Sequence, residues 1–191
     1  MTNTDDVIGR IDATLGTVTA DPVSADAMRC QPDATRPDFA ALLVPADLAE
    51  PIRLVDLDGQ ALAGARRFIG CQLISKLTVY GAGDVSTDFL FDDEGALYDG
   101  AVLNQRATEL IHVLKAAQFT GEYPAPADLR PQDLATDAEA WRRHVRLVGT
   151  VVIIGADERT GDFVPVPQRL LEFLTEALDV DLADGPTSQG G

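Results

Sequence analysis

Hydrophobic residues recur with two different periods between residues 38 and 178, and these periods predict both strands and helices. Short apolar or alternating runs bounded by Gly, Pro and Asp predict strands at residues 39–44, 52–57, 73–80, 85–91, 147–154 and 163–164. Apolar residues at helical spacing predict helices at residues 62–69, 104–117, 136–145 and 168–178. Because strands come in pairs with helices between them, we expect an α+β fold: a single domain with a mainly antiparallel or mixed sheet packed by two to four helices.

Polar residues and glycines mark where several of these elements begin and end. Asn104 is a good N-cap for the helix that the sequence predicts most clearly. Thr136 and Glu139 have the spacing of a capping box and predict that a helix begins there. The acidic tetrad at residues 92–95 ends in glycine and separates two apolar runs, which predicts a hairpin. The β-branched, nearly all-apolar run at 147–154 predicts a central strand covered on both faces.

Three segments lie outside the regular pattern. Residues 1–37 are predicted to be an irregular lead-in, in which a short helix could begin near residue 5. Residues 119–146 form a Pro-rich and helical insertion within the predicted domain of residues 38–178. Residues 179–191 lack apolar periodicity, and we expect them to form a disordered acidic tail.

The composition is that of a globular protein without special stabilising devices. The chain has 191 residues, of which 46% are hydrophobic, and this is enough to bury a core without disulfides or metals. No stretch reaches the ~20 consecutive apolar residues that a membrane span needs. The N-terminus carries acids where a signal peptide carries bases. We therefore expect a cytoplasmic protein in which Cys30 and Cys71 are free thiols.

The charge balance is strongly acidic. Fifteen Lys and Arg residues against 31 Asp and Glu residues give a formal net charge of −16, which disfavours direct binding to DNA, RNA or anionic lipid. Plain solubility, adaptation to high salt and mimicry of nucleic acid toward a basic partner all fit this balance. The acids gather at residues 84–99 and again after residue 169.

Positive charge gathers in one place, at Arg142, Arg143 and Arg146. At helical spacing Trp141 and Val145 share one face, next to the face shared by Arg142 and Arg146. We therefore expect Trp141 to dock this helix onto the domain. The arginines should point outward, toward the acidic residues near 92–94 or toward a second subunit.

The sequence predicts no catalytic residue, cofactor or metal, and we expect that the protein is not an enzyme. It holds no P-loop, dinucleotide fingerprint, nucleophile elbow or zinc-protease motif. His112 and His144 are too far apart, and the cysteines too few, for a structural zinc site. Asp92, Asp93 and Glu94 are the best candidates for acid–base or hard-metal chemistry, yet adjacent acids in a turn are typical of a solvated surface.

Three segments together resemble one protein family. They are FAALLVPADLAEPIRLVDLDGQALAGARRFIG at 39–70, FDDEGALYDGAVLNQRA at 91–107 and VGTVVIIGADERTGDFVPV at 148–166. In order and spacing they are similar to the family known as domain of unknown function 3846, over about residues 38–178. The matching positions are Gly70, Asp93, Glu94, Gly95, Asn104, Ala107, Gly149, Val152 and Gly155. The resemblance implies a phage, plasmid or actinobacterial setting and a shared fold, and it implies no particular activity.

Two hypotheses for the function follow. The first is a non-catalytic acidic interaction protein of mobile-element type that binds a protein partner. In its sharper form it is a nucleic-acid mimic that inhibits a host or defence protein. The alternative is a small-ligand-binding or enzymatic domain, in which Asn104 and Arg106 hold an anion at a helix N-terminus. The candidate interaction residues are Asp92, Asp93, Glu94, Asn104, Arg106, Arg142, Arg143 and Arg146.

Overall fold

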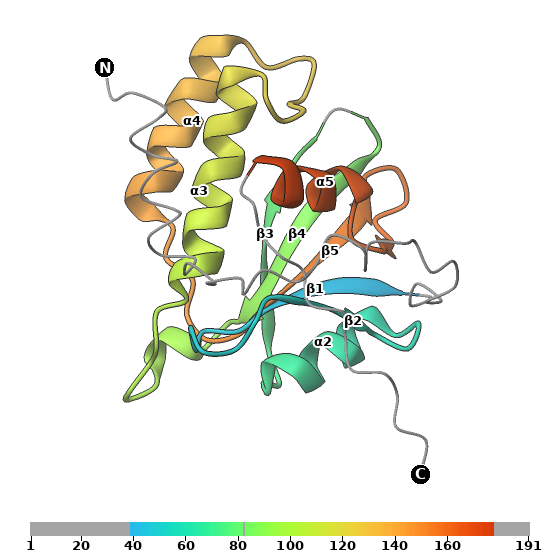
Figure 1. Ribbon diagram of the computed structural model, residues 1–191, viewed down its shortest axis with the longest axis vertical. Helices are drawn as coiled ribbons and strands as arrows, with labels where there is room; N and C mark the ends of the chain where they lie inside the picture. Colours follow the sequence, from blue (N-terminus) through green and yellow to red (C-terminus); the bar gives the residue numbers. More distant parts are fainter. Residues whose placement is uncertain (1–38, 82, 178–191) are drawn as a thin grey trace, which may run out of the picture.

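A computed structural model describes residues 39–81 and 83–177, which form an antiparallel sheet with helices on both faces (Figure 1). The strands are β1 (Ala40–Val44), β2 (Arg53–Asp56), β3 (Ile74–Val79), β4 (Val85–Asp92), β5 (Val151–Asp157) and β6 (Phe163–Val164). The helices are α2 (Ala61–Ile69), the 3₁₀ helix η1 (Gly95–Leu97), α3 (Gln105–Thr120), α4 (Pro131–His144) and α5 (Gln168–Ala177). This arrangement confirms the predicted single α+β domain.

Strands that lie far apart in the sequence pair with one another in the sheet. The strand order is β2-β1-β5-β4-β3, with β6 paired to β5, and every pairing is antiparallel. β5 is therefore a central strand, as predicted, and its residues from Val151 to Ala156 are buried. The predictions for residues 1–37 and 179–191 fall outside the described residues. None of the helices described is both long and apolar enough to cross a membrane.

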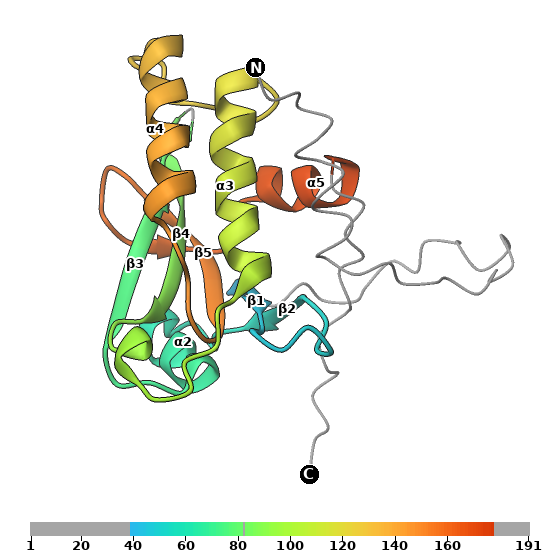
Figure 2. The ribbon, with the colours of Figure 1, turned by 90° about the vertical axis from the view of Figure 1, so that its left-hand side faces the viewer.

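The core has two parts, one on each face of the sheet. Ala40, Leu42 and Val44 of β1 belong to the larger part, which also holds the buried faces of α3 and α5 (Figure 2). Ala41 and Leu43 point to the other face and pack with residues of α2. The strict alternation along β1 explains why this strand is apolar at every position and buried throughout.

α2 lies close against the strand that precedes it. A Cβ atom at Gly64 would come within 2.8 Å of the Leu57 Cβ, so only glycine permits this approach. The helix ends at Gly70, which has φ +79° in the left-handed region. The predicted strand, helix and glycine stop in this part of the chain are therefore confirmed.

The predicted hairpin at residues 92–95 is wrong. β4 runs to Asp92, and the chain then turns into η1 instead of a returning strand. The physical reason lies in the strand order: β3 and β5 already pair with the two sides of β4, so a further strand has no free edge beside it. The apolar residues that follow the turn are left at the surface.

The predicted start of the helix within the insertion is also wrong. α4 begins at Pro131, five residues before Thr136, because proline is well suited to the first helical position. Thr136 lies inside the helix and its hydroxyl donates to the Gln132 carbonyl at 2.9 Å. Glu139 binds two arginines of the next turn instead of a backbone N–H, so the capping box does not form.

Trp141 attaches α4 to the domain, as predicted. Its ring packs against the larger core and lies 4.6 Å from the Lys115 Nζ of α3, and both side chains bind Asp137. Arg142 and Arg143 are each 67% exposed in their side chains, so these arginines point outward. Their partner is Glu139 of the same helix and not the acidic segment near residue 92. Arg146 donates to the carbonyls of Arg142 and Val145.

Candidate functional site

The acidic residues predicted at 92–94 lie where β4 ends. Asp92 accepts a hydrogen bond from the Glu94 N–H at 3.1 Å, and the Asp93 N–H donates to the Leu73 carbonyl at 3.1 Å. The Asp93 carboxylate also accepts from the Ser75 hydroxyl. Glu94 is the N-cap residue of η1, and its carbonyl accepts from the Leu97 N–H at 2.8 Å. Within the described chain none of these three carboxylates forms an ion pair with a lysine or arginine.

Exposed apolar side chains follow these acids directly. Leu97 is 80% exposed, Tyr98 55% and Val102 59%, although each is large and hydrophobic. The phenol of Tyr98 lies beside Glu94, and burial together with the charges of Asp92 and Glu94 raises its pKa. We call residues 92–103 the acidic ridge. It projects from the lower end of the molecule in the view of Figure 1, around η1.

Asn104, predicted as a helix cap and as an anion ligand, is a fully buried cap. Its Oδ1 accepts from the Ala107 N–H at 2.9 Å. Its Nδ2 donates to the Val44 carbonyl at 2.8 Å and to the Gly149 carbonyl at 2.9 Å. The side chain thus joins the start of α3 to the end of β1 and to the segment before β5. All of its donors are directed at the backbone.

Arg106 is also used inside the protein. The residue is 4% exposed, and its guanidinium donates to the carbonyls of Pro45, Asp47 and Glu50, each at 2.6 Å. Burial lowers the pKa of Arg106, while the nearby carboxylates of Asp47 and Glu50 act in the opposite direction. The guanidinium therefore secures the loop between β1 and β2. The geometry gives no support to an anion site at Asn104 and Arg106.

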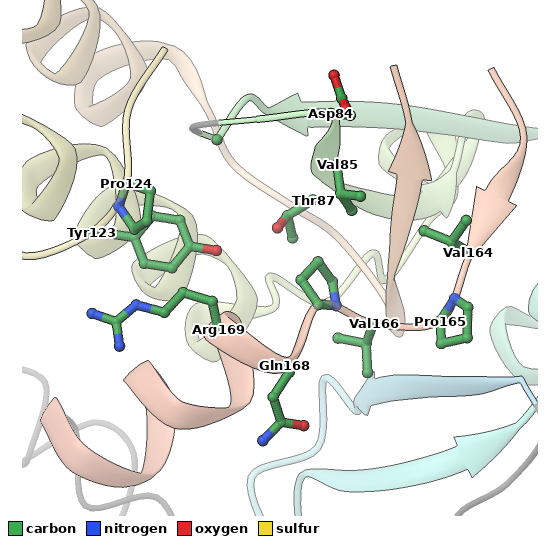
Figure 3. Close-up of a pocket in the computed structure, with 12 residues that line it drawn as sticks. Asp84, Val85, Thr87, Tyr123, Pro124, Val164, Pro165, Val166, Gln168 and Arg169 are labelled. Carbon is green, nitrogen blue, oxygen red and sulfur yellow. The ribbon is translucent and has the colours of Figure 1, made fainter. Parts of the chain in front are cut away.

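A separate pocket, of about 440 Å³, lies near the opposite end of the sheet and was not predicted (Figure 3). The turn before β4, the segment after α3 and the connection from β6 to α5 each supply part of its wall. Two buried hydroxyl groups face it: Tyr123, 6% exposed, bonds to Thr87, 2% exposed. Burial raises the pKa of Tyr123. Arg169, at the start of α5, is the cationic residue of the wall.

The site residues do not form a metal centre. No group of three or more His, Cys, Asp or Glu residues suited to a metal ion occurs in the part of the chain that is described. His112 faces the end of α4, where burial, followed by the charge of Arg146, lowers its pKa. Cys71 is a free thiol, and burial with the nearby Asp92 charge raises its pKa.

The fold and these surfaces define an α+β domain with an acidic, partly apolar ridge at one end and a small pocket toward the other. Comparisons with models of protein families, with curated proteins and with solved structures find no match. The resemblance to the family of domain of unknown function 3846 therefore stays a prediction.

Proposed function

We propose that this chain is a non-catalytic acidic interaction protein that binds a basic surface of a partner protein. The observation that supports this is the uncompensated charge of the acidic ridge. Most lysine and arginine side chains in the described part of the chain are bound within it. Asp92, Asp93, Glu94 and Asp99 are without such a cation there.

A net charge of −16 attracts partners of opposite charge. Screening limits the range of this attraction to about 8 Å at physiological ionic strength, so binding weakens as salt is added. If the resemblance to a phage and plasmid family holds, the partner is a host or defence protein. The basic surface is then one that normally binds nucleic acid, and the ridge carboxylates take the place of phosphates.

The charge of the ridge can be tested against the same charge change elsewhere. We expect the full chain to retain a basic protein from a bacterial lysate at low salt and to release it at about 0.5 M NaCl. D93N/E94Q/D99N should weaken retention of that protein about tenfold, since each exposed charge contributes roughly 0.5 kcal/mol. E122Q/D128N/E158Q removes three exposed carboxylates outside the ridge and is the matched control. The proposal would be contradicted if retention does not depend on salt, or if both triple variants lose retention equally.

A second candidate function is the binding of a small molecule in the pocket near α5. The hydroxyls of Thr87 and Tyr123, with Arg169 beside them and Val and Pro residues around them, favour a small anion with an apolar body. The wall also holds Gln168 and the carboxylate of Asp84, which pairs with Arg159 at 3.5 Å. We expect benzoate or a nucleotide to raise the Tm of the wild type in a thermal-shift screen. R169Q should remove that shift, and R143Q, on the outer face of α4, should leave it. The absence of any shift would remove this candidate and leave the first one intact.

A further inference from the structure

We propose that Leu97 and Tyr98 are the apolar anchors of the acidic ridge and that the segment docked there is amphipathic, with apolar side chains flanked by Lys or Arg. This inference rests on the proposed function and names the chemistry of its partner. It starts from two properties that coincide in residues 92–103: carboxylates that form no ion pair with Lys or Arg in the described chain, and large apolar side chains that are exposed.

The exposed apolar side chains are concentrated in one short segment. Four of them occur together in the ridge: Leu97, Tyr98, Val102 and Leu103. Among the described residues, the other exposed large hydrophobic side chains are more dispersed along the chain: Tyr80 and Val85 flank the β3–β4 turn, and Leu62 and Phe119 lie on separate helices. Leu73, 52% exposed, is joined to the ridge through its carbonyl. Exposed apolar patches with a polar rim are typical of protein-binding sites.

Backbone hydrogen bonds hold the ridge in one shape. The Ala101 N–H donates to the Tyr98 carbonyl at 3.1 Å, and the Gly149 N–H donates to the Val102 carbonyl at 2.9 Å. Leu103 forms an isolated antiparallel bridge with Val148 next to β5. A surface that is already ordered loses little conformational entropy when a partner binds. The anchors are therefore presented before binding and do not need to be formed by it.

Charge identifies the occupant as a basic segment of another protein. The N-terminal 38 residues carry more acids than bases, and residues 178–191 carry acids and no base. Both would be repelled by Asp92, Asp93, Glu94 and Asp99. A second copy brings the same net charge of −16, and its Arg142 and Arg143 are bound to Glu139. An external segment rich in Lys or Arg has none of these disadvantages.

Two fluorescent peptides of equal charge provide the probe. One is an 18-residue helix with Lys on one face and Leu on the other, and its twin has Ser in place of Leu. We expect the full chain to bind the Lys–Leu peptide about tenfold more tightly than the Lys–Ser peptide in anisotropy titrations. L97S/Y98S should remove this preference and leave the affinity for the Lys–Ser peptide unchanged. L62S/Y80S changes an exposed Leu and Tyr outside the ridge and should keep the preference.

The outcomes separate this inference from the proposed function. If L97S/Y98S still prefers the Lys–Leu peptide, the assignment of Leu97 and Tyr98 as apolar anchors is wrong. In that case, loss of binding to both peptides in D93N/E94Q/D99N would still support an acidic binding surface. If that charge variant binds both peptides like the wild type, the proposed function fails as well. A dimer in sedimentation experiments that L97S/Y98S abolishes would make a second copy the occupant. Chemical cross-links between residues 96–103 and residues 1–38 or 178–191 of the same free chain would make its own termini the occupant, and either result overturns the inference.

Discussion

Asn104→Asp is expected to lower the free energy of unfolding by about 4 kcal/mol and the Tm by roughly 10 °C. The substitution keeps an oxygen that can accept from the Ala107 N–H, so the helix cap itself survives. It removes both N–H donors to the carbonyls of Val44 and Gly149. It also places a negative charge between two carbonyl oxygens at a position with 0% exposure. Denaturant titrations followed by circular dichroism would measure the change.

The matched control for this variant is Gln60→Glu. Gln60 is the N-cap of α2, is exposed and makes no side-chain cap hydrogen bond. A carboxylate there is close to the positive end of the helix dipole, so the expected change lies within about 0.5 kcal/mol. A cap alone contributes about 1 kcal/mol. If Asn104→Asp costs no more than that, its role in joining β1 to the segment before β5 is wrong.

The sequence predicts best those elements that local chemistry defines. The glycine after α2, the cap before α3 and the apolar run that forms β1 depend on residues within a few positions of one another. Each of these predictions agrees with the structure. Predictions that depend on which strand pairs with which across the sheet agree less well with the structure. The segment after Asp92 has the apolar composition of a strand, but whether it can pair depends on β3 and β5, which lie far from it in sequence.

The candidate site shows the same division. Its acids were predicted from their run in the sequence, and their lack of cations could be seen only once the arginines were placed. The predicted hairpin places Leu97 and Tyr98 in a strand, whereas their exposure depends on how the whole chain folds. The pocket near α5 gave no signal, since its wall comes from three distant segments.

Arg106 is the clearest case of a residue whose chemistry was recognised and whose partner was not. A guanidinium two residues inside a helix N-terminus is a reasonable ligand for an anion. The strand order instead brings the loop of residues 45–50 beside it, and three backbone carbonyls take the place of the anion. Carbonyl oxygens carry partial negative charge, so they satisfy the same donors without a ligand.

Arg106→Met is therefore expected to destabilise the protein by about 3 kcal/mol, because it removes three charge-assisted hydrogen bonds and leaves the carbonyls of Pro45, Asp47 and Glu50 without that donor. Arg106→Lys should recover only part of this loss, since one ammonium group cannot reproduce the planar array of guanidinium donors. Arg66→Met, at an exposed position of α2, is the matched control and should change stability by less than about 0.5 kcal/mol.

Hydrogen exchange and added phosphate distinguish an internal tie from an anion ligand at Arg106. If the side chain secures the β1–β2 loop, Arg106→Met accelerates exchange of the Glu50 N–H, which donates to the Asp47 carbonyl at 3.2 Å. Phosphate then changes the Tm of the wild type and of this variant equally, because the guanidinium is buried against three backbone carbonyls. If phosphate stabilises the wild type alone, Arg106 binds the anion and the loop is not its main partner. Since the guanidinium already has a carbonyl on three of its N–H groups, we expect the first result.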